Sequence, residues 1–138
     1  MRLDIGLKRV YDPPEPKDGL RVLVDRLWPR ALSKEGARID EWVRELAPSH
    51  ALRQWFGHDP NRWEEFRRRY RDELLSPERR QKLSSLLETA FRQKTTFLFG
   101  AKDRDHNNAV VLREVLMAIA REERPQAPSR PKEKTPQR

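Results

Sequence analysis

Residues 21–30 read Arg-Val-Leu-Val-Asp-Arg-Leu-Trp-Pro-Arg, and this stretch decides the fold that we expect. Its apolar run, residues 22–24, is typical of a strand that is buried on both faces of a parallel sheet. Polar residues begin at once with Asp25, and Pro29 ends regular structure. Open α/β sheets bind their ligands at the carboxyl ends of their strands, so the same stretch predicts where a functional site lies.

A second apolar run, Thr-Thr-Phe-Leu-Phe-Gly-Ala at residues 95–101, also breaks abruptly into polar residues. The segment between the two runs, residues 38–92, is long enough to cross over a sheet and return as a parallel strand. We therefore predict a helix-rich, single-domain α/β fold with a small, mostly parallel sheet flanked by helices. Its two central strands would end side by side, one at Asp25 and the other at residues 101–102.

Local signals place the remaining elements. Alternating apolar residues predict a first strand near residues 4–10, and the second strand covers about 20–25. Residues 27–37 contain a proline and a glycine and predict a loop or a single turn. An amphipathic helix that Pro48 ends is predicted from the i, i+3, i+4, i+7 spacing of four apolar residues: Ile39, Trp42, Val43 and Leu46.

Capping signals predict where the later helices begin. Ser49 is a good N-cap for a short helix that ends near Phe56. Asp59 followed by Pro60 starts the next helix, since proline fits the first helical position. Ser76 and the proline after it repeat this signal. A last helix follows the polar residues after 101, with apolar side chains at helical spacing.

The composition indicates one folded domain, residues 1–121, with a tail at residues 122–138. The chain has 138 residues, no cysteine and a formal net charge of +8. The tail is rich in proline and basic residues, so we expect it to be disordered. Without cysteine, disulfides and thiolate chemistry are excluded. No apolar run approaches the roughly 20 residues of a membrane span, and we expect a cytosolic protein without a membrane partner.

Motifs along residues 5–120 carry a family resemblance. They include Lys8-Arg9-Val10-Tyr11-Asp12, Gly19 before the 21–30 stretch, Trp42, Pro48-Ser49, Leu52-Arg53, Trp55-Phe56, His58, Trp63, Phe66, Tyr70, Glu73-Leu74, Ala101-Lys102-Asp103 and Asn107-Asn108-Ala109. On these residues the chain resembles the DUF488 family of bacterial proteins, in its short, YeaO-like branch. Ala31 stands where such proteins more often have glycine. The resemblance implies an α/β fold and carries no catalytic role, because the family name denotes a domain of unknown function.

The first candidate binding group is Asp25, Arg26, Trp28 and Arg30. Two guanidinium groups can grip a phosphate or carboxylate bidentately, and an indole can stack on a base or close a pocket. We therefore expect a small anionic ligand here. The alternative is a purely structural cluster in which Asp25 pairs with an arginine and Trp28 fills core.

The second candidate binding group is Lys102, Asp103, Asn107 and Asn108, which would lie beside the first if the strands are neighbours. The N-terminus of the last helix offers free N–H groups to an anion. The alternative is helix capping by Asp105 or Asn107. The spacing matches no calcium loop, and a single histidine makes a poor zinc site, so we predict neither a metal nor a cofactor.

Three further residues are candidates at the same edge of the sheet. Arg53 would complete the anion pocket from a helix. His58 is a secondary candidate, either as a general acid or base or as a residue that links two helices. Tyr11 ends the first strand and either points its hydroxyl at the pocket or belongs to the rim of the core.

Three function classes lead at the level of sequence, and protein–protein scaffolding through an exposed tryptophan also stays open. The leading one is an electropositive pocket for a phosphate- or nucleotide-like anion. The second is a nucleic-acid-binding module that uses the arginines of residues 67–71 and the basic tail, with salt-sensitive affinity. The third is an enzyme on a nucleotide-like substrate with Asp25 or Asp103 as base, which requires a raised carboxylate pKa. The sequence shows no nucleophile elbow and no Gly-rich phosphate loop, and it predicts no oligomeric state.

Overall fold

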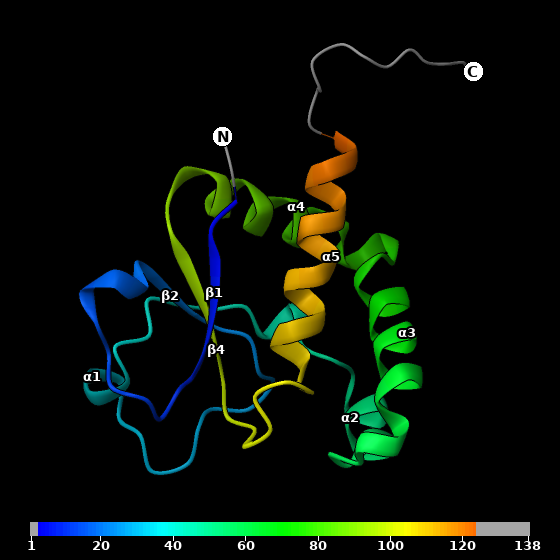
Figure 1. Cartoon of the computed structure of the whole chain (residues 1–138), viewed down its shortest axis with the longest axis horizontal. Coiled ribbons are helices and arrows are strands. Elements are labelled where there is room, and N and C mark those ends of the chain that lie inside the picture. Colours follow the sequence, from blue (N-terminus) through cyan, green and yellow to red (C-terminus); the bar gives the residue numbers. More distant parts are fainter. Residues whose placement is uncertain (1–2, 124–138) are drawn as a thin grey trace.

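The protein is built on a four-stranded sheet in which every pair of neighbouring strands is parallel (Figure 1). The computed structural model describes residues 3–123. The strands are β1 (Ile5–Arg9), β2 (Leu20–Leu23), β3 (Glu41–Trp42) and β4 (Thr95–Phe99), in the spatial order β1-β4-β2-β3. The predicted α/β fold is confirmed, and so is the prediction that the two apolar runs are neighbours, because Leu23 lies opposite Leu98.

Helices supply most of the remaining structure. The α-helices are α1 (Lys34–Ala37), α2 (His50–Phe56), α3 (Trp63–Leu74), α4 (Pro77–Arg92) and α5 (Asn108–Glu123), and the 3-10 helices are η1 (Pro16–Asp18), η2 (Arg44–Leu46) and η3 (Pro60–Arg62). Within residues 3–123, none of these helices has the length and apolarity to cross a membrane. Helix α5 includes the first two residues of the predicted tail, and the rest of that tail lies outside the described residues.

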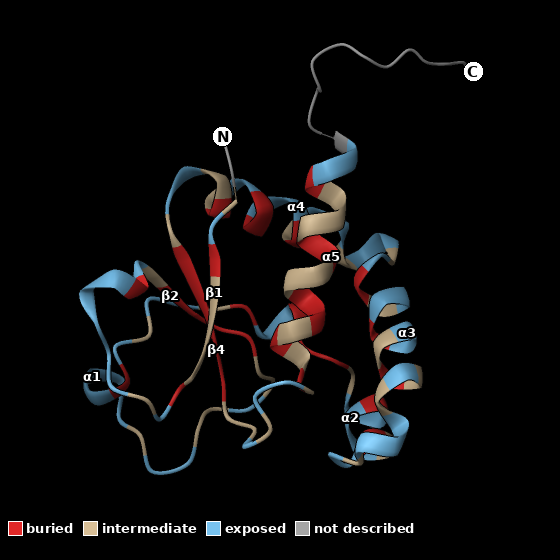
Figure 2. Cartoon of the chain, viewed as in Figure 1, coloured by how far each residue is buried: buried red, intermediate tan, exposed pale blue. Residues whose placement is uncertain are grey.

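The central strands are buried on both faces, as their apolar runs predict. Val22 and Phe97 point into a large core that also takes the inner sides of α3, α4 and α5. Leu23 and Leu98 point to the opposite face, into a smaller cluster with Trp28 and other partly buried residues. In Figure 2 the buried residues accordingly concentrate in the middle of the sheet and on the sides of the helices turned toward it.

The helix predicted from Ile39 to Leu46 is wrong. The chain there forms the two-residue strand β3 and the short helix η2. Ile39 and Trp42 pack in the smaller cluster, whereas Val43 and Leu46 pack in the large core on the other face. A helix with one apolar side packs on one face of a sheet, so these four residues could not reach both clusters from a helix.

Backbone pairing with β2 explains why the extended form prevails at β3. The N–H of Asp40 donates to the carbonyl of Arg21 at 2.8 Å, and the N–H of Val43 donates to that of Leu23 at 3.0 Å. The Asp40 carboxylate also accepts the N–H of Arg21 at 2.8 Å. Hydrogen bonds to the edge of β2 thus outweigh a helical periodicity that rested on only four apolar residues.

The predicted cap of α2 is confirmed, whereas Pro60 begins the 3-10 helix η3 and α3 itself begins at Trp63. The Ser49 hydroxyl accepts the N–H of Leu52 at 3.2 Å, and it also donates to the Glu73 carboxylate at 2.6 Å. Asp59 accepts the N–H of Asn61 at 2.9 Å at the start of η3. Helix α4 begins at Pro77, although the hydroxyl before it donates back to a carbonyl instead of capping the helix.

Arg21 is the buried link between β2 and the segment that leads to β3. Its guanidinium group donates to the Asp18 carboxylate at 2.6 Å and to the carbonyls of Ala37 and Arg38 at 2.9 and 3.0 Å. The side chains of Arg21 and Asp18 are both only 5% exposed. Lys8 donates to the same carboxylate at 3.0 Å, so the buried charges are compensated.

We expect Arg21→Met to lower the free energy of unfolding by about 3 kcal/mol, because it breaks a buried ion pair and leaves two carbonyls unpaired. Urea unfolding followed by far-UV circular dichroism measures the change. Lys17→Met is the matched control, since that side chain is 81% exposed, and it should stay within about 0.5 kcal/mol of the wild type. A loss from Arg21→Met below about 1 kcal/mol, the range of surface pairs, would contradict this role.

Candidate functional site

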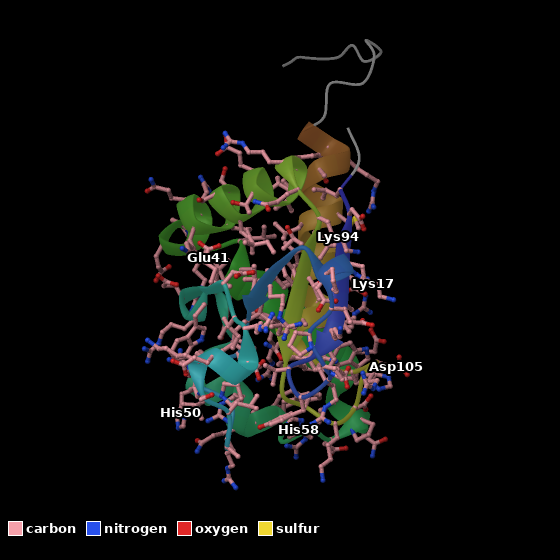
Figure 3. The ribbon with its side chains drawn as sticks, turned by 90° about the vertical axis from the view of Figure 1, so that its left-hand side faces the viewer. Lys17, Glu41, His50, His58, Lys94 and Asp105 are labelled. Atoms are coloured by element: carbon pink, nitrogen blue, oxygen red, sulfur yellow. The ribbon has the colours of Figure 1, made fainter. Side chains whose placement is uncertain are left out.

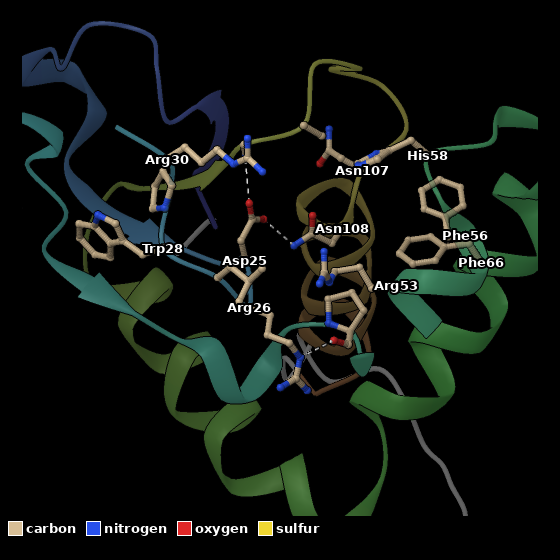
Figure 4. A pocket seen from close by; sticks show the side chains of 15 residues that line it. Asp25, Arg26, Trp28, Arg30, Arg53, Phe56, His58, Phe66, Asn107 and Asn108 are labelled. Atoms are coloured by element: carbon tan, nitrogen blue, oxygen red, sulfur yellow. Dashed lines mark hydrogen bonds between the residues drawn. The ribbon is translucent and has the colours of Figure 1, made fainter. Parts of the chain in front are cut away.

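A cavity of about 330 Å³ lies where β2 and β4 end (Figure 4). Its walls come from the segment after β2, from α2 and α3, from the end of β4 and from the start of α5. Its lining residues are Asp25, Arg26, Leu27, Trp28, Pro29, Arg30, Pro48, Arg53, Phe56, His58, Phe66, Gly100, Ala101, Asn107 and Asn108. Figure 3 shows His58 and Asp105 toward the lower end of the molecule, opposite Lys94, which precedes β4.

Asp25 joins three elements at the base of the cavity. One carboxylate oxygen accepts the backbone N–H of Gly100 at 2.9 Å, just beyond β4. The other oxygen accepts the side-chain N–H of Asn108 at 3.1 Å, at the first residue of α5. Asn108 donates to the carbonyl of Val24 as well, at 3.0 Å. The carboxylate therefore connects the end of β2 to the end of β4 and to α5.

Burial raises the pKa of Asp25 above its usual value of 3.8. The hydrogen bonds from Gly100 and Asn108 act in the opposite direction, as do the electrostatic effects of His58 and Arg53, but together they offset only part of the desolvation. Among the two carboxylates proposed as bases, Asp25 therefore has the raised pKa, whereas hydrogen bonds from His106 and neighbouring N–H groups lower that of Asp103.

Two arginines reach the cavity with uncommitted guanidinium groups. Arg30 lies on the segment after β2, and Arg53 lies on α2. Within residues 3–123, neither guanidinium forms a hydrogen bond or an ion pair. Figure 4 shows both groups turned toward the middle of the cavity, on either side of Asp25 and Asn108. These two side chains are the arginines of the cavity wall that have no hydrogen-bond or ion-pair partner among the described residues.

Arg26 and Trp28 also line the cavity, but each donates one hydrogen bond to a backbone carbonyl. The Arg26 guanidinium donates to the carbonyl of Pro48 at 3.3 Å and turns away from Asp25 in Figure 4. The Trp28 indole N–H donates to the carbonyl of Leu32 at 2.7 Å, and its ring packs edge-on against Trp42 with centroids 5.5 Å apart. The structural alternative weighed for Trp28 thus describes its main contacts.

The second predicted group is divided. Asn107 and Asn108 line the cavity, whereas Lys102 and Asp103 do not. The Asn107 side chain accepts the N–H of Val110 at 3.2 Å and so caps α5, which was the alternative to an anion site. The Asp103 carboxylate accepts N–H groups of the following loop and pairs with His106 at 3.0 Å.

Of the secondary candidates, one reaches the cavity. His58 lines it from the turn after α2, with its backbone in the left-handed region at φ 58°. Tyr11 does not line it; its hydroxyl donates to the carbonyl of Arg30 at 3.1 Å and so holds the backbone that presents this arginine. Ala31, which follows Arg30 in the chain, has a φ of 62°, a conformation that favours glycine.

No functional signal in the sequence pointed to the aromatic wall of the cavity. Phe56 and Phe66 stack with ring centroids 4.2 Å apart and line the side formed by α2 and α3. Their spacing in the sequence indicates only the inner side of a helix, and both are buried. Their place beside Arg53 follows from the docking of α2 on α3.

The arginine run at residues 67–71 is largely neutralised. Arg67 pairs with Glu64 at 2.8 Å and with Glu114 at 3.0 Å, and the next two arginines pair with Glu65. Arg71 forms no ion pair among the described residues. The described part of the chain also contains no cluster of three acidic, histidine or cysteine side chains that could hold a metal ion.

Comparison with known proteins assigns the family. A family model described as "Inactive DUF488-N3 subclade" matches residues 4–133. The chain belongs to this subclade. The resemblance to the YeaO-like branch is confirmed as well, because the chain is 41% identical over 117 residues to "Uncharacterized protein YeaO" of Escherichia coli K12, which covers 85% of this chain and 100% of the relative.

Relatives in mycobacteria extend the comparison. The chain is 36% identical over 112 residues to "Uncharacterized protein Rv3073c" of Mycobacterium tuberculosis and to "Uncharacterized protein Mb3100c" of Mycobacterium bovis. Each alignment covers 81% of this chain and 92% of the relative. No solved structure matches the chain.

We expect Asp25→Asn to gain stability relative to the wild type as the pH rises. A raised pKa in the folded state means that folding penalises the charged form, so the penalty is absent below the unfolded pKa and complete above the folded pKa. Urea unfolding at a series of pH values from 2 to 8 measures the difference between variant and wild type.

Asp103→Asn provides a control of opposite sign. Because the folded pKa of Asp103 is lowered, its charge contributes stability above the unfolded pKa, and that contribution is lost as the pH falls through the folded pKa. This variant should therefore be less stable than the wild type at pH 7. Equal pH trends for the two variants would contradict the assignment of Asp25 as the buried, penalised carboxylate.

Proposed function

We propose that the protein binds a phosphate- or nucleotide-like anion in the cavity at the carboxyl ends of β2 and β4. The observation that carries the proposal is the pair of uncommitted guanidinium groups, Arg30 and Arg53, turned into one cavity (Figure 4). Guanidinium groups are weakly hydrated and bind phosphate or carboxylate in a planar, bidentate manner. A volume of about 330 Å³ falls within the range of small-molecule sites.

The contacts of the lining residues favour a preformed site. Arg53 projects from α2, which Ser49 caps and Glu73 holds in place. Arg30 lies on a segment whose backbone Tyr11 holds by a hydrogen bond. Because the protein has already fixed these backbones, a ligand pays little ordering entropy beyond that of the two side chains.

Binding without turnover is the function that we favour over catalysis. No serine, threonine or cysteine lines the cavity, so the lining residues offer no hydroxyl or thiol nucleophile. The subclade to which the chain belongs is described as inactive. The raised pKa of Asp25 suits a base, but its hydrogen bonds with Gly100 and Asn108 also give this carboxylate a structural role.

We expect Arg30→Ala and Arg53→Ala each to weaken binding of the anion at least tenfold, because each removes a charge-assisted contact of about 1.5–3 kcal/mol. A thermal-shift screen of the full chain against phosphate, sulfate, sugar phosphates and nucleotides finds the ligand. A ligand at 100 times its dissociation constant adds about 2.7 kcal/mol of stability, and titration calorimetry then compares the variants.

Two variants serve as matched controls. Arg80→Ala removes an exposed arginine of α4 that does not line the cavity, and Lys102→Ala removes a lysine that lies outside it. Both should bind the anion as the wild type does, with unchanged melting temperature. A screen without any hit, or equal losses in the cavity and control variants, would refute the proposed function.

A further inference from the structure

The cavity contains a carboxylate between its two free guanidinium groups. Asp25 lies with Asn108 at the base, and Arg30 and Arg53 face it from two sides (Figure 4). A site for a bare anion would place only donors around the ligand. Here a negative group lines the same small volume, so an anion without other polar features would meet repulsion from Asp25.

The hydrogen bonds of Asp25 leave it able to accept more. A carboxylate offers about four lone-pair positions, and the protein uses one on each oxygen, through Gly100 and Asn108. The remaining positions can accept N–H groups from a ligand. The donor that fits best is one held at a fixed distance from an anionic group, since the guanidinium groups and the carboxylate share one cavity.

The walls of the cavity favour a flat, apolar body between these two polar ends. Phe56 and Phe66 form a stacked aromatic side, and Leu27 and Pro29 contribute apolar surface from the segment after β2. Small-molecule sites combine such apolar walls with a few polar groups that fix orientation. A heterocycle that carries an amine meets these demands, whereas a bare phosphate or a simple sugar phosphate leaves Asp25 without a partner.

We propose that the ligand is a nucleoside monophosphate whose base carries an exocyclic amine, with the phosphate at Arg30 and Arg53 and the amine at Asp25. This inference rests on the proposed anion-binding function and names the chemistry of its ligand. Asp25 acts as a specificity-determining residue: its charge disfavours anions that bring no donor and favours those that do.

Nucleotide pairs that differ by a single amine test the inference without any mutation. Titration calorimetry compares GMP with IMP, which lacks the 2-amino group, and AMP with purine riboside 5′-monophosphate, which lacks the 6-amino group. We expect at least one pair to lose tenfold or more in affinity with the amine, the effect of one charge-assisted hydrogen bond. Ribose 5-phosphate and phosphoethanolamine complete the series as an anion without a base and an amine without a base.

Asp25→Asn tests the assigned partner. The amide is nearly the same size and carries no charge, so the discrimination within the nucleotide pair should fall to threefold or less, while ribose 5-phosphate should bind more tightly than to the wild type. The same discrimination in wild type and variant would overturn the role of Asp25. Circular dichroism and the melting temperature show that the variant is folded, and the wild-type comparison stands whether or not it is.

The remaining outcomes separate the two proposals. If ribose 5-phosphate or inorganic phosphate binds and the amine makes no difference in either pair, the ligand inference fails and the anion site stands. If phosphoethanolamine binds as tightly as the best nucleotide, the flat body is not recognised and the inference fails as well. If none of these compounds binds, both proposals fail.

Discussion

The arrangement of the candidate site depends on the hydrogen bonds that the Asp25 carboxylate accepts. It accepts hydrogen bonds from Gly100, just after β4, and from Asn108, at the start of α5, while its own backbone continues β2. Parallel strands place their carboxyl ends at one edge, but they do not fix how the chains diverge beyond that edge. The Asp25 carboxylate fixes these paths because it bridges three segments. The cost is a buried charge, and burial raises the pKa of this carboxyl group.

The surrounding residues divide into those that hold this edge and those that remain free. The indole N–H of Trp42 donates to the carbonyl of Asp25 at 2.8 Å, and Asn107 caps α5. Arg9 donates to the carbonyls of Gly100 and Ala101, both at 2.9 Å. Most polar groups around the strand ends thus form hydrogen bonds within the protein. Arg30 and Arg53 differ from them, and this difference marks them as candidates for ligand binding. A charged side chain that faces a cavity without a hydrogen bond or ion pair among the described residues is available to a ligand.

Membership of a subclade described as inactive agrees with this division of roles. Asp25, the carboxylate with the raised pKa, serves the fold as an acceptor for Gly100 and Asn108. The proposed binding role needs only charge and shape, for which the arginines and the aromatic wall are the candidates. The ion pairs of α3 disfavour the nucleic-acid alternative. Glu64, Glu65 and Glu114 neutralise three of its arginines and leave little positive charge for a phosphate backbone.

The sequence by itself determined the parallel sheet, the helix starts that Ser49 and Asp59 cap, and the edge at which the cavity lies. These features depend on local signals, namely unbroken apolar runs, caps and proline. Only the tertiary structure decided that Ile39–Leu46 divides between two faces, because free hydrogen-bonding groups on β2 drew that segment into the sheet. It also decided which cations face the cavity. Arg26, Arg30, Arg53 and Lys102 are alike as residue types, and what separates them is whether a carbonyl lies within reach and which way the backbone turns after each strand or helix. Those are properties of contacts between distant segments, which no local pattern in the sequence encodes.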